Sequence, residues 1–179
     1  MLLNEITQTT MQFWHGGNLD VETSVRAGKW EYGPGLYLTT HYLTAKKYAK
    51  GGRKFYRITV AQGNDSETTS IDFAQIQNFV NKYCIVAKRK EILQALTKYN
   101  VDGRIIAEYL ITILLNYDGL KSSRANDLRH FLVSNGVDYS IISNPFGWHE
   151  KMMVLFNMKK IVNTEIIKST DKIENFDLR

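Results

Sequence analysis

The alternation of apolar and polar positions divides the chain into three parts. Residues 10–60 combine short strand patterns, glycine-rich turns and one short helix, whereas residues 71–134 repeat their apolar positions at helical spacing. Residues 137–168 return to strand patterns. The pattern predicts an α+β protein in which a helical insert, at about residues 71–134, separates two strand-rich ends.

Four helices are predicted inside the insert. The first begins after Asp72, whose side chain can cap it, and the second ends near Asn100. The third lies between the turns at Asp102-Gly103 and Asp118-Gly119, and the fourth ends at Asn135-Gly136. Their apolar residues recur at helical spacing, so these helices should pack their apolar faces inward.

Strand patterns mark both ends of the chain. Residues 54–60 alternate between two sets of side chains, which is typical of a half-buried strand. Residues 152–156 are continuously apolar, as in a strand that is buried on both faces, and residues 161–167 indicate a further strand. An apolar strand is also expected to end at His15.

Composition places the chain among folded globular proteins. It has 179 residues, of which 44% are hydrophobic and 23% charged, and this length fits a single domain spanning residues 1–179. The longest apolar stretch, residues 105–115, is interrupted by Glu108 and is shorter than the roughly 20 residues that cross a bilayer. Residues 1–10 carry no Lys or Arg of the kind that opens a secretory signal. We therefore expect a cytoplasmic protein that does not engage a membrane.

Cysteine and histidine usage argues against a metal centre. The single Cys84 cannot form an internal disulfide, and no His or Cys pair has the spacing of metal ligands. His149 and Glu150 are neighbours in an expected strand, where adjacent side chains point to opposite faces, so they should not converge on one ligand. No metal cofactor is expected.

Three short segments combine glycine, aromatic and titratable residues. In Phe13-Trp14-His15-Gly16-Gly17, an apolar strand ends at a His that two glycines follow. Glycines allow a ligand to approach the backbone closely. Residues 32–40 form a glycine-rich turn that leads into a helix, and residues 144–150 place Glu150 at the mouth of a buried strand. Taken singly, each segment is also explained as a turn, a core helix or a charged strand edge.

Together and in this order, the segments resemble the ADP-ribosyltransferase superfamily, in the His-Tyr-Glu branch that contains diphtheria-type toxins and the poly(ADP-ribose) polymerases. The resemblance covers about half the chain, its two ends, and looks closest to bacterial and phage variants. It implies a split antiparallel β-sandwich that binds NAD in a cleft, and the helical insert has no counterpart in it. The matching motifs are His15-Gly16, Gly33-Pro34-Gly35-Leu36-Tyr37-Leu38, Ala45-Lys46-Lys47-Tyr48, Gly136-Val137-Asp138-Tyr139 and Glu150-Lys151-Met152-Met153-Val154-Leu155-Phe156.

The resemblance implies three catalytic residues: Glu150, His15 and Tyr37. Glu150 would stabilise the positive charge that builds on the ribose as the nicotinamide leaves, and would hold the ribose 2′-hydroxyl. His15 would hydrogen-bond a ribose hydroxyl, and the backbone of Gly16 would hold the nicotinamide amide. The expected reaction is inverting displacement of nicotinamide.

Further NAD contacts are implied on the turn and on the helix that follows it. Tyr37 and Tyr48 would stack on either side of the nicotinamide ring, with a core position as the alternative for Tyr48. The polymerases usually carry Ser where Ala45 stands, which would remove one hydroxyl contact to the nicotinamide amide. Thr44 could supply that hydroxyl instead.

Basic and aromatic residues beside the proposed cleft suggest which kind of macromolecule accepts the ADP-ribose. The chain carries a net charge of +5, and the run from Lys46 to Lys54, together with Lys88-Arg89-Lys90, would steer a nucleic acid toward the cleft. A solvated face is the alternative explanation. RNA or DNA is thus slightly favoured over protein, and Trp148 stands where arginine-specific transferases carry a second Glu, which disfavours arginine as the modified group. The candidate acceptor-binding residues are Lys46, Lys47, Lys50, Arg53 and Trp148.

The sequence therefore predicts a mono-ADP-ribosyltransferase that uses NAD as co-substrate and modifies a macromolecule. A toxin or phage-defence effector that an antitoxin protein silences is the biological role that the resemblance suggests. Three alternatives stay open: an NAD glycohydrolase, a non-enzymatic module that binds nucleic acid on the same fold, and an RNA 2′-phosphotransferase, whose basic catalytic set is not visible here.

Overall fold

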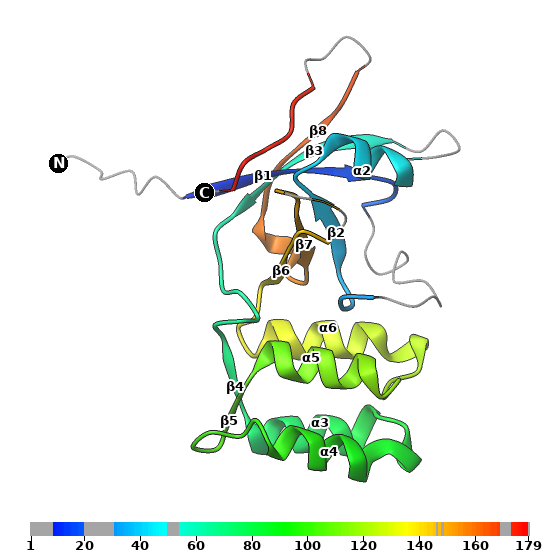
Figure 1. Cartoon of the computed structure of the whole chain (residues 1–179), viewed down its shortest axis with the longest axis vertical. Helices are drawn as coiled ribbons and strands as arrows, with labels where there is room; N and C mark the ends of the chain where they lie inside the picture. Colours follow the sequence, from blue (N-terminus) through cyan, green and yellow to red (C-terminus); the bar gives the residue numbers. More distant parts are fainter. Residues whose placement is uncertain are drawn as a thin grey trace, which may run out of the picture.

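The computed structural model describes residues 9–19, 31–49, 54–145, 147, 149–168 and 173–178. Its main feature is a six-stranded antiparallel sheet with the order β6-β7-β2-β1-β3-β8, which occupies the upper part of Figure 1. The strands are β1 (Thr10–Gly16), β2 (Leu36–Thr39), β3 (Phe55–Ala61), β6 (Tyr139–Ser143), β7 (Lys151–Leu155) and β8 (Ile161–Ile166). The strand patterns expected near residues 54–60, 152–156 and 161–167 are confirmed.

Five α-helices lie in the described ranges, so the protein is of the mixed α+β class. Four of them belong to the expected insert, and Asp72 caps the first as predicted, its Oδ1 accepting from the backbone N–H of Gln75 at 3.1 Å. None of the helices in the described ranges is long and apolar enough to cross a membrane. The helices are α2 (Tyr42–Tyr48), α3 (Phe73–Tyr83), α4 (Arg89–Thr97), α5 (Ala107–Asn116) and α6 (Ala125–Ser134).

The insert also contains a small β-ribbon that the sequence pattern did not predict. Strands β4 (Ser70–Asp72) and β5 (Arg104–Ile106) pair in antiparallel fashion, and Ile71 and Ile105 are opposite each other and buried. The third helix therefore begins at Ala107 and not directly after Gly103. A turn with positive φ at Asp102 and Gly103 precedes β5, and the pairing of β5 with β4 delays the start of the helix.

The helices of the insert form two layers on one side of the sheet. Figure 1 shows α5 and α6 next to the sheet, with α3 and α4 beyond them. One buried cluster joins the layers and includes Val154 of β7 and Phe156 after it, together with Ile111 of α5 and Leu128 of α6. The insert is thus packed on the sheet through a shared apolar core, which burial of such side chains stabilises.

A second apolar cluster lies within the sheet and draws residues from both ends of the chain. It combines buried residues of β1, β2, β3, β6 and β7: Phe13, Leu36, Leu38, Ile58, Val60, Tyr139, Met153 and Leu155. Strands that the insert separates in sequence therefore pack together in space.

The six strands divide into two half-sheets at the boundary between β1 and β2. β1 pairs with β3 from Thr10 to Gly16, and β2 pairs with β7 over its whole length. β1 and β2 are in register at a single position, Trp14 with Thr39. The β6-β7-β2 and β1-β3-β8 half-sheets thus meet at one point, called the junction below. Backbone groups beside it need partners other than a continuous ladder.

Candidate functional site

His15 lies one residue past the junction, at the end of β1, and its ring is buried between two backbone carbonyls. Nδ1 is 2.9 Å from the Tyr37 oxygen, and Nε2 is 3.1 Å from the Asn18 oxygen. The pairing of β1 with β2 has stopped here, although β1 still pairs with β3. The side chain of His15 therefore reaches β2 where a regular ladder would use backbone groups. The imidazole therefore bridges the two half-sheets.

The protonation state of His15 leaves one ring nitrogen without a proper partner. Burial lowers the pKa of His15 below its ordinary value of 6.5, and the two carbonyl contacts oppose this only in part. A neutral ring carries a single N–H and can donate to one carbonyl only. The ring therefore donates to one of the two carbonyls, and its other nitrogen is an acceptor that faces another acceptor. A ligand hydroxyl that donates to this nitrogen would satisfy it.

Tyr37, on β2, is half-buried, and its phenol is fixed to the turn that precedes the strand. Its Oη donates to the Gly33 carbonyl at 2.9 Å and accepts from the backbone N–H of Tyr32 at 3.2 Å. Burial raises the pKa of Tyr37, and the negative charge of Glu31 raises it further. The phenol therefore stays protonated and serves as an anchor for the ring rather than as a base.

Glu150 directly precedes β7 and is 4% exposed. Thr39 of β2 donates its hydroxyl to Glu150 Oε1 at 2.6 Å. The same hydroxyl accepts from the backbone N–H of His41 at 3.0 Å, so its lone pair is engaged and its proton is directed to the carboxylate. Thr39 was not predicted from the sequence, where only its polar character at the end of an apolar strand distinguishes it.

The expected catalytic residues His15 and Tyr37 lie on the adjacent strands β1 and β2, and Glu150 directly precedes β7, the next strand. β2 lies between β1 and β7 and links the other two residues: its Tyr37 carbonyl contacts His15, and its Thr39 hydroxyl contacts Glu150. Among the described hydrogen bonds, none joins His15 to Glu150 directly. The group is therefore organised around β2.

The C-terminal segment, residues 173–178, runs beside this group. The Phe176 N–H donates to the Thr40 carbonyl at 3.0 Å, and Lys151 Nζ donates to the Leu178 carbonyl at 2.6 Å. The Phe176 ring stacks on Trp14 with 4.9 Å between centroids. Thr40 and Lys151 directly follow Thr39 and Glu150, so the segment is anchored beside the candidate site.

Helix α2 packs on the end of β1 at Gly16. A Cβ on Gly16 would overlap the Ala45 carbonyl oxygen and lie 2.8 Å from the Ala49 nitrogen. Ala45 and Thr44 are buried on this side of the helix. Helix packing therefore gives Gly16 a structural requirement in addition to the ligand contact that the resemblance implies.

Tyr48 and the candidate acceptor-binding residues lie on the surface or outside the described ranges. Tyr48 is 56% exposed, so the alternative of a core position is wrong. Lys46 and Lys47 are exposed in the last turn of α2. Lys50, Arg53 and Trp148 lie outside the described residues.

The basic triplet of the insert is largely engaged in capping helices. Lys88 Nζ donates to the carbonyls of Tyr117 at 2.6 Å and Asp118 at 3.2 Å, just past α5. Arg89 Nε donates to the Cys84 carbonyl at the end of α3 at 3.0 Å. Cations at helix C-termini are stabilising, which accounts for both residues without a nucleic acid.

No group of three or more His, Cys, Asp or Glu gathers in a metal-binding arrangement within the described part of the chain. The expected strand does not include His149 and Glu150, because His149 lies in a turn with a φ of 64° and β7 begins at Lys151. His149 is exposed whereas Glu150 is buried. No protein-family model, curated protein or solved structure matches this chain. The function therefore has to be inferred from the residues and their geometry.

Proposed function

We propose that the protein is a mono-ADP-ribosyltransferase that binds NAD beside the junction and breaks its nicotinamide–ribose bond. One observation carries the proposal: in three motifs far apart in sequence, His15 lies on β1, Tyr37 on the adjacent strand β2, and Glu150 directly before β7, the next strand, where the sheet divides. No continuous ladder joins the two half-sheets there, since β1 and β2 are in register at one position. The split antiparallel β-sandwich implied by the resemblance belongs to the same proposal.

The local geometry suits the recognition of NAD. One ring nitrogen of neutral His15 lacks a donor, and a ribose hydroxyl is a donor of the required kind. The half-buried ring of Tyr37 is held by its phenol, so it can offer a fixed surface on which a nicotinamide ring stacks. Exposed Tyr48 could close over the other side of the ring, and the Gly16 backbone and Thr44 would hold the amide.

Glu150 suits the reaction itself. When the bond from ribose C1′ to the pyridinium nitrogen breaks, its electron pair stays on nitrogen and neutral nicotinamide leaves, so positive charge builds on the ribose. A buried carboxylate held by Thr39 stabilises that charge more than it stabilises the ground state. The acceptor nucleophile then bonds to C1′ and loses its proton to solvent.

The acceptor is proposed to be a macromolecule that receives a single ADP-ribose unit. The resemblance to bacterial and phage variants adds a toxin or phage-defence role, with an antitoxin protein as the inhibitory partner. An NAD glycohydrolase is the second candidate. A buried carboxylate beside the junction would stabilise the charge on the ribose equally well if water, and not a macromolecule, accepted the ADP-ribose.

Labelled NAD tests the proposal. The protein is incubated with NAD that carries a label in its adenylate part, separately with cell protein, RNA and DNA, while free nicotinamide and macromolecular label are followed. Glu150→Gln is compared with Glu67→Gln, an exposed carboxylate elsewhere. Label on a macromolecule that Glu150→Gln alone abolishes is expected. Nicotinamide release without transfer would indicate a glycohydrolase, and no release under any condition would overturn the enzyme proposal.

A further inference from the structure

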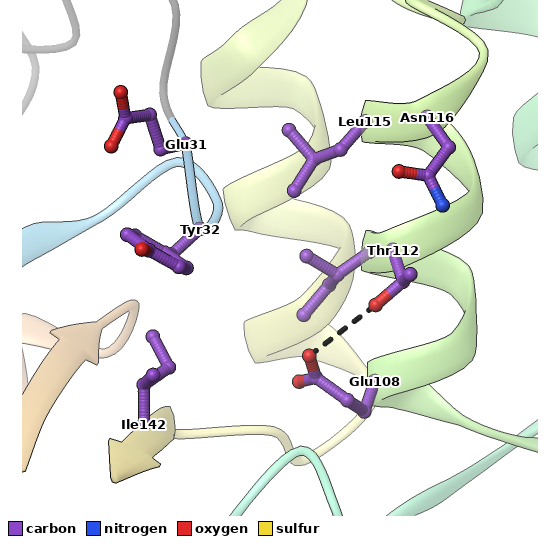
Figure 2. Close-up of a pocket in the computed structure, with 8 residues that line it drawn as sticks. Glu31, Tyr32, Glu108, Thr112, Leu115, Asn116 and Ile142 are labelled. Carbon is purple, nitrogen blue, oxygen red and sulfur yellow. Dashed lines mark hydrogen bonds between the residues drawn. The ribbon is translucent and has the colours of Figure 1, made fainter. Parts of the chain in front are cut away.

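A separate pocket of about 230 Å³ lies at the seam between the insert and the sheet. Figure 2 shows its two sides: α5 on one, and on the other Ile142 of β6 with the Glu31-Tyr32 segment that precedes β2. Neither His15 nor Glu150 lines it, and its volume suits one amino-acid side chain rather than a dinucleotide. Its lining residues are Glu31, Tyr32, Glu108, Ile111, Thr112, Leu115, Asn116 and Ile142.

The lining combines apolar walls with two carboxylates. Ile111, Leu115 and Ile142 offer aliphatic surface, and the ring of Tyr32 lies across the pocket from α5 (Figure 2). Glu108 and Glu31 add acceptors on opposite sides. Such a lining suits a ligand with an apolar stem and a cationic, flat end.

Within the described part of the chain, no cation neutralises the negative charge of the pocket. Glu108 Oε2 accepts from Ser66 Oγ at 2.7 Å and from Ser140 Oγ at 3.1 Å, whereas Oε1 has only a long 3.5 Å contact with Thr112. Within the described residues, no Lys or Arg forms an ion pair with Glu31 or Glu108, and the sequence of α5 contains neither residue type. Hydroxyl donors fix the Glu108 carboxylate but supply no counter-charge.

The pKa values of two neighbouring groups, Asp65 and Tyr37, also indicate a negative electrostatic potential near the pocket. Burial raises the pKa of Asp65, and the nearby charge of Glu108 raises it further. The negative charge of Glu31 likewise contributes to the raised pKa of Tyr37. In a chain of net charge +5, the seam is a local region of the opposite sign. A phosphate group would be repelled here, and a cation would be attracted.

We propose that this pocket binds the guanidinium group of an arginine side chain that belongs to a protein acceptor. The guanidinium is flat, stays protonated, and presents several N–H donors that suit carboxylate acceptors. Its face can lie on the Tyr32 ring while its methylene stem contacts Ile111 and Leu115. Arginine serves as an anchor, and the modified group lies elsewhere on the acceptor.

The pocket adjoins the candidate site. The backbone N–H of Tyr32 donates to the Tyr37 phenol, and Ile142 pairs with Met152, two residues after Glu150. An arginine held in the pocket would bring its chain close to the start of β7. The role in acceptor recognition rests on the proposed function, whereas guanidinium binding does not.

Binding is tested without NAD, using N-acetyl-arginine amide as the probe and its citrulline analogue as an uncharged probe of similar shape. Two-dimensional NMR titration of the wild-type protein should give saturable shifts near Ile111 and Leu115, with affinity for the citrulline probe lower by roughly tenfold or more. Equal affinity for the two probes, or no saturable binding, would overturn the proposal.

Variants connect the binding to the pocket. Glu108→Gln keeps the side-chain shape and should lower the affinity for the arginine probe by roughly tenfold, whereas Glu67→Gln should leave this affinity unchanged. Because Glu108→Gln could affect folding, Thr112→Arg, at an exposed position, provides a second variant that should fill the pocket and block the probe. Wild-type affinity in Thr112→Arg would contradict the assignment. Probe binding in a protein that releases no nicotinamide would reject the acceptor role alone.

Discussion

The hydroxyl of Thr39 shows how single residues organise the candidate site. It accepts from the N–H that starts α2 and donates to Glu150, so one side chain connects the helix entry with the carboxylate. Both Thr39 and Glu150 are buried, and a buried carboxylate that loses a donor is costly. We therefore regard Thr39 as a positioning residue for Glu150.

Thr39→Val keeps the shape of the side chain but removes the donor. We expect kcat for nicotinamide release to fall by about tenfold with little change in KM for NAD, because the carboxylate is misplaced while the NAD contacts remain. Thr39→Ser keeps the hydroxyl and should retain most of the activity. Steady-state kinetics of both variants provide the check. Equal losses of kcat in Thr39→Val and Thr39→Ser would argue against the positioning role.

His15 makes stability depend on pH in a defined direction. Its pKa is lower in the folded protein than the ordinary value of 6.5, so the unfolded chain binds more protons between the two values. The contribution of His15 to the free energy of unfolding is therefore fully present above about pH 6.5. It is lost as the pH falls from that value toward the pKa of His15 in the folded protein. Urea unfolding at several pH values should show a smaller loss for His15→Gln than for wild type. The same comparison with exposed His149→Gln should show no such difference.

At the scale of elements, the contact between α2 and β1 has no room for a side chain. Gly16→Ala places a methyl group against the backbone of Ala45 and Ala49, and backbone yields less readily than a flexible side chain. We expect a loss of about 1–3 kcal/mol in the free energy of unfolding, as in other overpacked interiors. Gly147→Ala, where nothing lies within 4 Å, is the matched control and should change stability little. Similar stabilities of the two variants would contradict this packing.

Local patterns predicted most of the elements, and the failures involve partners distant in sequence. The four helices of the insert and the strands near residues 54–60 and 152–156 were predicted because their periods are local. The ribbon was missed because Ile105 and Ile106 look alike in a helix and a strand, and their partner β4 lies more than thirty residues earlier. Pairing with that distant strand decides their conformation.

The candidate site was predicted to a similar extent. His15, Tyr37 and Glu150 were singled out from motifs, and they lie on β1, on β2 and directly before β7. Thr39 was not recognisable as a partner of Glu150, because the two residues are 111 positions apart and only the β2–β7 pairing brings them together. The pocket at the seam was also missed, because it is formed by the insert, for which no motif was available.

At the scale of the whole molecule, the C-terminal segment connects the end of the chain to the junction. Phe176 stacks on buried Trp14, whose indole N–H donates to the Glu174 carbonyl at 2.9 Å. Phe176→Ala should lower the free energy of unfolding by about 2 kcal/mol, from lost apolar burial and the lost aromatic pair. Ile173→Ala, in the same segment but exposed, should have little effect. Chemical denaturation distinguishes the two, and an unaffected Phe176→Ala would show that the segment is not docked in solution.

The central claim is that Glu150 cleaves NAD beside the junction, and the rate of nicotinamide release tests it most directly. Purified wild-type protein, Glu150→Gln and the exposed control Glu67→Gln are compared by chromatography at saturating NAD, after equal melting temperatures have been verified. Glu150→Gln should reduce the rate by about 100-fold or more, as expected when a main stabiliser of transition-state charge is removed, and Glu67→Gln should match wild type. Equal rates in wild type and Glu150→Gln would contradict the account.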